Sequence, residues 1–169
     1  MLAAVPVTYR GTRFRSTLES NWAATFDEWR WHWEYEPVAL YTGDGEPYLC
    51  DFYLPSQRVW CEVKGPHDER LHKAVSLART LRVDPAEWTV AAPIVVLLRP
   101  PGPGDRATWE PAMPEQDIVL IDCSDCQYLG FMDLAAGWQC RRCYRQQKIY
   151  SHMGGYYRSG QLQFHRAGR

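Results

Sequence analysis

A predicted hairpin of two strands constrains the fold of this chain more than any other feature of its sequence. Residues 48–54 and 58–64 are the two predicted strands, and Pro55-Ser56-Gln57 makes a short turn between them. Such a turn joins antiparallel neighbours, and each strand turns alternate side chains to opposite faces. The hairpin therefore decides which side chains of the two strands share a face.

Three charged residues gather on one face of this hairpin. Glu62 and Lys64 are two positions apart on the second strand, so both point to the same side. Asp51 lies in the middle of the first strand, an unfavourable place for an acid unless the position is used. Clustered carboxylates repel each other, and a hard divalent cation relieves the repulsion. The cluster suits metal-assisted phosphodiester hydrolysis, although an exposed strand face with paired charges is a common alternative.

Elements on both sides of the hairpin indicate an α/β fold. A helix is expected from Ser16 to about His32, because Ser16 is a good N-cap and apolar residues follow at helical spacing. Residues 33–41 are expected to be extended. A second helix is expected from His67 to about Val83, and the apolar run 93–98 is typical of a strand covered on both faces. The predicted order is αβββαβ.

The chain then changes character. Residues 99–116 are rich in Pro and Gly and predict a loop or linker, and residues 117–121 predict one more strand. Two Cys-x-x-Cys pairs follow, separated by thirteen residues: Cys123, Cys126, Cys140 and Cys143. This spacing suits a closed, tetrahedral, structural Zn²⁺ site and a fold that resembles a zinc ribbon. Two disulfides are the alternative, which a cytosolic chain disfavours. The remaining cysteines, Cys50 and Cys61, are expected to be buried thiols.

The start of the chain lacks the features of a signal peptide, and no stretch of about 18 apolar residues exists. A cytoplasmic protein with no membrane partner is therefore expected. Charge is distributed unevenly. Residues 1–133 hold all 20 acids and 12 of the 19 Lys and Arg residues, a balance of −8, whereas residues 134–169 carry +7. This asymmetry predicts a polyanion partner, with a solubilising tail as the alternative. The candidate nucleic-acid contacts are Arg10, Arg13, Arg15, Arg141, Arg142, Arg145 and Lys148.

Three stretches together resemble the PD-(D/E)XK nuclease superfamily. They are Ser16-Thr17-Leu18-Glu19, the segment Tyr48-Leu49-Cys50-Asp51-Phe52-Tyr53-Leu54-Pro55, and Trp60-Cys61-Glu62-Val63-Lys64-Gly65. The resemblance covers roughly residues 8 to 98 and is greatest to phage-type junction resolvases and transposon end-cleaving endonucleases. Cys50 stands where the family has the proline of its Pro-Asp motif. That proline is not a ligand, so the chemistry stays plausible.

The resemblance implies a restriction-endonuclease-like core with a mixed sheet and a role for each site residue. Asp51, Glu62 and the Val63 carbonyl would hold Mg²⁺ or Mn²⁺, and Glu19 would complete the site or add a second metal position. Lys64 would orient or help deprotonate the attacking water. Glu19 has another explanation, because it follows Ser16 at the spacing of a capping box.

We therefore expect a nuclease core over residues 1–116 and a zinc ribbon with a basic tail over 117–169. The expected function is a Mg²⁺-dependent DNA endonuclease acting on branched or recombination-intermediate DNA. The family implies a homodimer, because two strands need two sites. A transposase-like end-cleaving subunit is an alternative. So is a non-catalytic DNA-binding or assembly module that keeps a nuclease-like fold.

Overall fold

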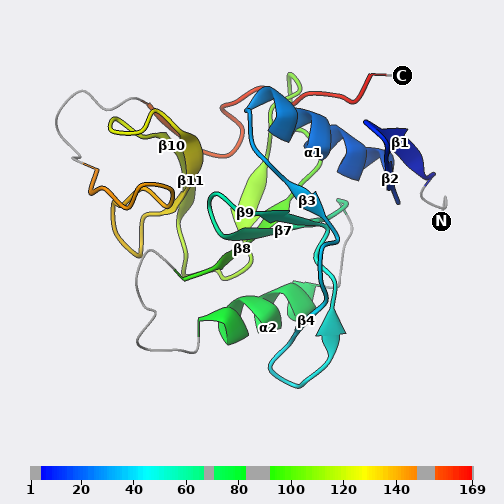
Figure 1. Cartoon of the computed structure of the whole chain (residues 1–169), viewed down its shortest axis with the longest axis horizontal. Coiled ribbons are helices and arrows are strands. Elements are labelled where there is room, and N and C mark those ends of the chain that lie inside the picture. Colours follow the sequence, from blue (N-terminus) through cyan, green and yellow to red (C-terminus); the bar gives the residue numbers. More distant parts are fainter. Residues whose placement is uncertain (1–4, 67–70, 83–91, 148–154, 169) are drawn as a thin grey trace.

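The structure is a computed structural model, and it describes residues 5–66, 71–82, 92–147 and 155–168. Its centre is a five-stranded sheet with two helices on opposite sides (Figure 1). The strand order is β3-β6-β7-β8-β9. The strands are β3 (Glu34–Tyr35), β6 (Phe52–Leu54), β7 (Val59–Val63), β8 (Ile94–Leu98) and β9 (Trp109–Pro111).

The sheet is mixed, as the sequence predicts. β7 and β8 run parallel, with Glu62 opposite Leu97, and the other neighbouring pairs are antiparallel. All five residues of β8 are buried, which confirms a strand covered on both faces. β6 and β7 form the predicted hairpin with Phe52 opposite Cys61. The α/β class and the predicted hairpin are thereby confirmed.

Helix α1 (Thr17–Glu28) covers one face of the sheet and α2 (Leu71–Leu81) covers the other (Figure 1). The alternation along β7 explains this arrangement: Val59 and Cys61 pack with the α1 side, and Trp60 packs with the α2 side. Ser16 caps α1 as predicted. The helix ends at Glu28 rather than near His32, because the chain turns after Trp29 and buries Trp31 in the core.

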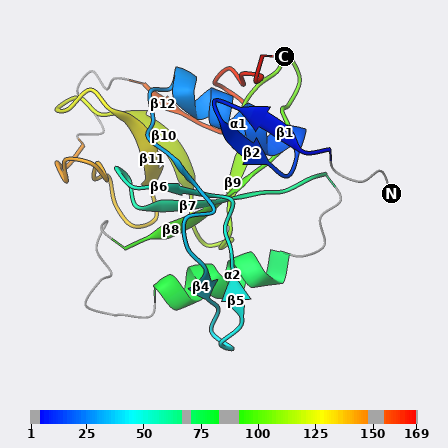
Figure 2. The same cartoon turned by 45° about the vertical axis from the view of Figure 1, so that its right-hand side comes forward.

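Two small hairpins were not predicted as such. β1 (Val7–Tyr9) and β2 (Thr12–Phe14) pair ahead of α1, across a turn at Gly11 whose φ of 81° favours glycine. β4 (Leu40–Tyr41) and β5 (Pro47–Tyr48) form a second hairpin that lies beside α2 (Figure 2). The strand predicted over residues 48–54 is therefore interrupted, and Asp51 sits just before β6 rather than in mid-strand.

The linker predicted over residues 99–116 is instead part of the fold. It contributes β9, which pairs with β8 at the edge of the sheet, and Ala107 and Trp109 are buried. The Trp109 indole N–H donates to the Ile118 carbonyl, 3.1 Å away. Apolar burial thus outweighs the Pro and Gly composition that favoured a loop.

A second, three-stranded sheet carries the cysteine segment. β10 (Ile118–Asp122) lies between β11 (Leu129–Asp133) and β12 (Tyr156–Tyr157), all antiparallel. One side of this sheet joins the main core, since Leu120 and Phe131 pack with the α1 side of the large sheet. The boundary at residue 116 remains a prediction, and residues on both sides of it share that core.

The segment predicted as a basic tail folds back over the molecule. Phe164 is buried against Trp22 of α1, with ring centroids 5.2 Å apart. The Leu162 carbonyl accepts from the Ala107 N–H at 2.8 Å, and the Asn21 side chain accepts from the Ala167 N–H at 2.9 Å. No helix in the described part of the chain is long and apolar enough to cross a membrane.

Candidate functional site

Asp51, Glu62 and Lys64 meet at one end of the β6–β7 hairpin, where all three side chains are buried. The Val63 N–H donates to Asp51 Oδ2 at 2.7 Å, and this hydrogen bond links the Asp51 side chain to strand β7. Lys64 Nζ lies 3.1 Å from Glu62 Oε1, and the Lys64 N–H donates to the Leu98 carbonyl. The structure thus brings together the two acids and the lysine that the hairpin predicts.

One oxygen of this cluster lacks a hydrogen bond. Glu62 Oε2 is buried without a hydrogen-bond partner among the described residues, and the same holds for the Tyr48 hydroxyl. The Tyr48 hydroxyl nevertheless lies close to Glu62: after burial, the Glu62 charge and a weak hydrogen bond between the two side chains, outside normal hydrogen-bond geometry, raise the Tyr48 pKa. A buried carboxylate oxygen in this state costs free energy that a cation or proton would relieve.

Burial, and after it the negative charge of Glu62, together raise the pKa of Asp51 to about 8. The pKa of Glu62 is also raised by burial, although Lys64 and Tyr48 partly offset the shift. Two buried carboxyl groups this close disfavour the doubly ionised state. Arg15 opposes this effect at Asp51 and Lys64 opposes it at Glu62, because each cation favours the ionised carboxylate beside it.

Glu19 is held by its own helix end. Its backbone N–H donates to Ser16 Oγ at 3.2 Å, and Ser16 Oγ donates to Glu19 Oε1 at 2.8 Å. The Tyr35 hydroxyl donates to Oε2 at 2.6 Å. The Glu19 side chain thus binds at the helix start, where it accepts from the Ser16 hydroxyl and from the Arg15 N–H at 3.1 Å rather than from the Ser16 N–H of a capping box. Among the described residues, Glu19, Asp51 and Glu62 do not form a group of three ligands placed to hold a metal ion.

Arg15 lies where a cation would be expected at this site. Its Nη2 is 2.6 Å from Asp51 Oδ1 and 2.6 Å from Glu36 Oε1. The Arg15 side chain is 60% exposed, so it can leave Asp51 without disturbing the core. This placement differs from the phosphate contact predicted for Arg15, since its guanidinium neutralises two acids of the protein itself.

The four cysteines form a second, separate site. Their sulfur atoms all lie within 4.8 Å of one another, with Cys123 Sγ to Cys143 Sγ at 3.6 Å and Cys126 Sγ to Cys140 Sγ at 3.8 Å. All four are free thiols. A tetrahedral ion with Zn–S bonds of ~2.3 Å would separate its sulfurs by about 3.8 Å. Disulfide bonding would need sulfurs about 2 Å apart. The four-cysteine cluster suits zinc, in agreement with the spacing.

The two halves of this cysteine site repeat one local structure. The Gln127 N–H donates to the Cys123 carbonyl at 2.8 Å, and the Tyr144 N–H donates to the Cys140 carbonyl at 2.9 Å. Both Gln127 and Tyr144 have positive φ, 54° and 61°. Gln147, which is buried, adds a donor to Cys123 Sγ at 3.3 Å. A hydrogen bond donated to a ligand sulfur orients it and favours the thiolate.

The predicted basic contacts have different environments. Arg10 pairs with Asp27, and Arg13 is exposed. Arg141 is 5% exposed and donates to the carbonyls of Gln57, Arg58 and Ala92. Burial lowers the pKa of Arg141 to about 10. This burial argues against the phosphate contact predicted for Arg141. Arg142 and Arg145 are exposed, and Lys148 lies outside the described residues.

Sequence reasoning missed Tyr48 and Gln147, and it missed the pairing of Arg15 with Asp51. A signal existed only for Gln147, a polar residue four positions after a zinc ligand. Tyr48 and Arg15 reach the carboxylates through tertiary packing. Comparisons with known protein families, with curated proteins and with solved structures find no match to this chain.

Proposed function

We propose that this protein is a divalent-metal-dependent DNA endonuclease whose active site is the carboxylate end of the β6–β7 hairpin. The observation that carries the proposal is the meeting of Asp51, Glu62 and Lys64, with Glu62 Oε2 buried and without a hydrogen bond among described residues. Structural acids of a core are normally satisfied, whereas a site that takes a ligand is not.

The residues present fit Mg²⁺ or Mn²⁺. Mg²⁺ uses one or two carboxylates and keeps several waters, so Asp51 and Glu62 suffice as protein ligands. Val63, whose carbonyl the resemblance implies as a third ligand, ends β7 and is tied to Asp51 through its N–H. Glu19 is engaged in capping and is not needed. When bound, the ion lowers the pKa of water and offsets charge on the phosphate.

The chain's own residues supply the rest of the chemistry. Lys64 stands beside Glu62 and can donate to a non-bridging phosphate oxygen as charge develops there. Arg15 can leave its ion pair with Asp51 and pair with the phosphodiester instead, because both partners are anions and the Arg15 side chain is mostly exposed. The buried walls around Cys50 and Trp60 restrict bulk water on the α2 side of the site.

The test is a cleavage panel with Mg²⁺ on linear duplex, single strand, nicked duplex, flap and four-way junction DNA. Glu62→Gln and Asp51→Asn are expected to lower the cleavage rate by at least about 10³-fold, because each removes a ligand charge. Glu110→Gln is the matched control, since Glu110 lies on the same sheet but pairs with Arg99. Strong preference for the junction would identify the branched-DNA subtype. Cleavage retained by both site variants would refute the proposal.

Glu19→Gln separates the two readings of Glu19. It keeps an oxygen for capping but removes the charge that a second metal position would need. Cleavage within about threefold of wild type is expected if Glu19 only caps α1. A loss as large as that of Glu62→Gln would instead place Glu19 among the metal ligands.

The Arg15–Asp51 contact favours a second candidate, a DNA-binding module without catalysis. In this reading Arg15 permanently neutralises Asp51 and no cation enters. Calorimetry of Mg²⁺ or Mn²⁺ with wild type, Arg15→Ala and Asp51→Asn separates the two. Tighter metal binding by Arg15→Ala supports the nuclease, and no binding by either wild type or Arg15→Ala supports the module.

A further inference from the structure

The turn end of the hairpin carries two arginines stacked on two tyrosines. The Arg58 guanidinium lies 5.2 Å from the centroid of the Tyr144 ring, and Arg142 lies 4.4 Å from that of Tyr128. Arg58 Nη2 also donates to the Tyr144 hydroxyl. Tyr144 is 46% exposed. We call these four residues the arginine–tyrosine platform.

The two arginines of the platform differ from several other surface arginines, because no carboxylate among the described residues forms an ion pair with them. Arg10, Arg158 and Arg166 pair with Asp27, Asp117 and Asp105. Within the described ranges, by contrast, neither Arg58 nor Arg142 forms an ion pair, and neither does the neighbouring Arg145. Their positive charge is therefore available to an anion from outside the molecule.

Arg141 holds the two parts of the platform together, the hairpin turn with Arg58 and the second cysteine pair with Arg142 and Tyr144. Arg141, adjacent to Arg142, inserts into the turn and donates to the Gln57 and Arg58 carbonyls. Tyr128 accepts at its hydroxyl from the Gln57 side chain at 3.4 Å. Arg58 has φ of 54° and Tyr144 has φ of 61°, conformations that side-chain-bearing residues seldom adopt. The hairpin turn and the second cysteine pair thus present one surface.

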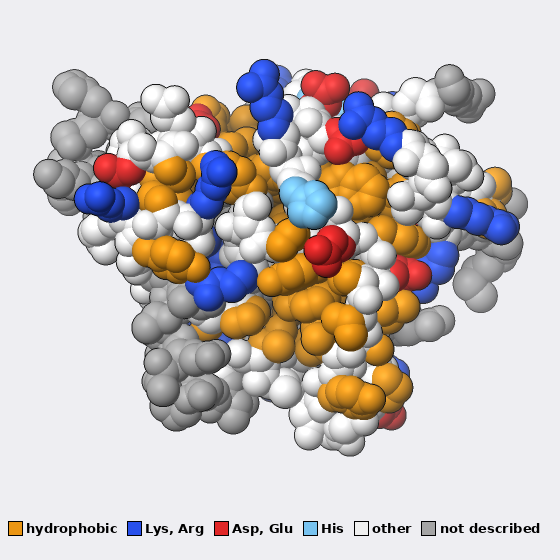
Figure 3. All heavy atoms as spheres, in the orientation of Figure 1, with side chains coloured by type: hydrophobic (Ala, Val, Ile, Leu, Met, Phe, Trp, Pro, Cys, Tyr) orange, Lys and Arg blue, Asp and Glu red, His pale blue; other side chains and the backbone are white. Residues whose placement is uncertain are grey.

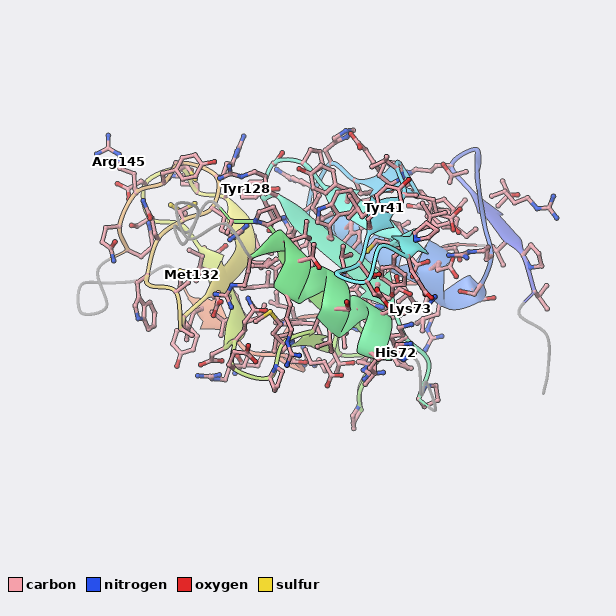
Figure 4. The ribbon with its side chains drawn as sticks, turned by 90° about the horizontal axis from the view of Figure 1, so that it is seen from below. Tyr41, His72, Lys73, Tyr128, Met132 and Arg145 are labelled. Atoms are coloured by element: carbon pink, nitrogen blue, oxygen red, sulfur yellow. The ribbon has the colours of Figure 1, made fainter. Side chains whose placement is uncertain are left out.

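The same strand links the platform to the carboxylates. Trp60 and Glu62 are two positions apart on β7, so they point to one face of the strand. Arg58 lies in the turn directly before β7, with a φ of 54°, and the three residue steps from Val59 to Glu62 span roughly 10 Å at ~3.3 Å per residue. Tyr53 stacks on Trp60 between the two ends, with ring centroids 4.3 Å apart. Figure 4 places Tyr128 and Arg145 at the end of the molecule away from Lys73 and His72 of α2.

We propose that the arginine–tyrosine platform binds an unpaired nucleic-acid strand, with phosphates on Arg58 and Arg142 and a base on the exposed ring of Tyr144. The proposal rests on the proposed function for the identity of the bound polymer. Tyr128 is half-buried and supports Arg142 from below, whereas Tyr144 is exposed. An exposed aromatic ring beside arginines without a carboxylate partner is a combination that holds single strands, because every base offers a π-face.

The test uses fluorescence anisotropy with a labelled 20-mer of deoxythymidine and a duplex of the same length, with zinc-loaded protein and no Mg²⁺. The double variant Arg58→Ala/Arg142→Ala is expected to weaken single-strand binding at least tenfold and to reduce the salt slope by about 0.7 per lost phosphate contact. Tyr144→Ala is expected to weaken binding about tenfold without changing the salt slope, and Tyr144→Phe to restore it.

Arg158→Ala is the matched control. Arg158 also lies over a tyrosine, Tyr156, at 5.9 Å, but it pairs with Asp117. Its removal is expected to leave binding within twofold of wild type. Zinc content and thermal midpoints of each variant confirm that the module stays folded.

The proposal is overturned if the double variant binds the single strand as wild type does, or if Arg158→Ala weakens binding equally. Duplex binding tighter than single-strand binding would also overturn it. These outcomes are independent of catalysis. Binding with the predicted dependence but no cleavage would refute only the nuclease, and cleavage with binding unaffected by the platform variants would refute only the platform.

Discussion

The two ends of the β6–β7 hairpin carry sites of opposite kinds. At the turn end, four cysteines converge through two repeats of one local hydrogen-bonding pattern. At the other end, Asp51 and Glu62 already have partners in Arg15 and Lys64. The geometry of the four cysteines is consistent with a structural zinc ion, whereas a metal ion at the carboxylates is a proposal.

This difference follows from how each site is assembled. Each Cys-x-x-Cys pair fixes its own backbone over four residues, so the sequence spacing largely determines the geometry. The carboxylate site draws on the segment before α1, the β5 strand and both strands of the hairpin. Its electrostatics depend on which neighbours reach it, and burial governs the pKa values there.

Removing zinc is expected to have the largest effect on the protein. Cys143→Ser should lower the zinc content from one per chain to none and reduce the free energy of unfolding by more than about 5 kcal/mol, because structural zinc contributes folding energy directly. Metal analysis and chemical denaturation provide the measurement. Cys50→Ala is the control, since Cys50 is buried in the α2 core and should leave zinc unchanged. Zinc retained by Cys143→Ser would contradict the assignment.

Arg141 and Arg142 offer a sharper comparison, because they are adjacent and chemically identical. Arg141→Met should lower the free energy of unfolding by about 3 kcal/mol, since it removes the donor of the Gln57 and Ala92 carbonyls and one of the two donors of the Arg58 carbonyl. Arg142→Met should cost less than about 1 kcal/mol, because Arg142 is exposed and only stacks on Tyr128. Denaturation of both variants is the measurement, and equal losses would contradict the structure.

A smaller effect is expected in the pH dependence of stability without added Mg²⁺. The folded-state pKa of Asp51, about 8, lies above its unfolded value near 3.8, so the folded state binds the proton more tightly between these values. The free energy of unfolding should therefore fall as pH rises toward 8. Asp51→Asn should remove this fall and be more stable than wild type by about 2 kcal/mol at pH 8.

Denaturation between pH 5.5 and 8.5 measures that difference. Asp117→Asn is the control, since Asp117 is an exposed partner of Arg158 and its change should leave the wild-type slope intact. A stability advantage of Asp51→Asn that shrinks as pH rises would contradict the raised pKa.

Local patterns could be predicted from the sequence, and long-range choices could not. Ser16 at the start of α1, the 55–57 turn and the cysteine spacing each act within a few residues, and the structure has all three. Trp109 shows the opposite case. It lies in a Pro- and Gly-rich stretch whose composition predicts a loop, but the stretch forms strand β9 because Trp109 is buried against distant residues. Sequence also cannot decide between Arg141 and Arg142, since only the position of the hairpin turn determines which one is buried.

One face of the molecule is rich in hydrophobic side chains. Hydrophobic side chains cover much of the middle of the face seen in Figure 3, and Lys and Arg side chains lie around its edges. Val38, Tyr41 and Leu49, near the carboxylate end, are exposed.

The returning segment around Phe164 has a consequence for the order in which the protein folds. Thr25 of α1 both donates to and accepts from the backbone of His165, a contact between residues 140 positions apart. Helix α1 cannot complete its packing until that segment has been synthesised, however early its own turns form. Contacts of such long range slow folding. During translation, Trp22 stays without its contact to Phe164 until that segment has been synthesised.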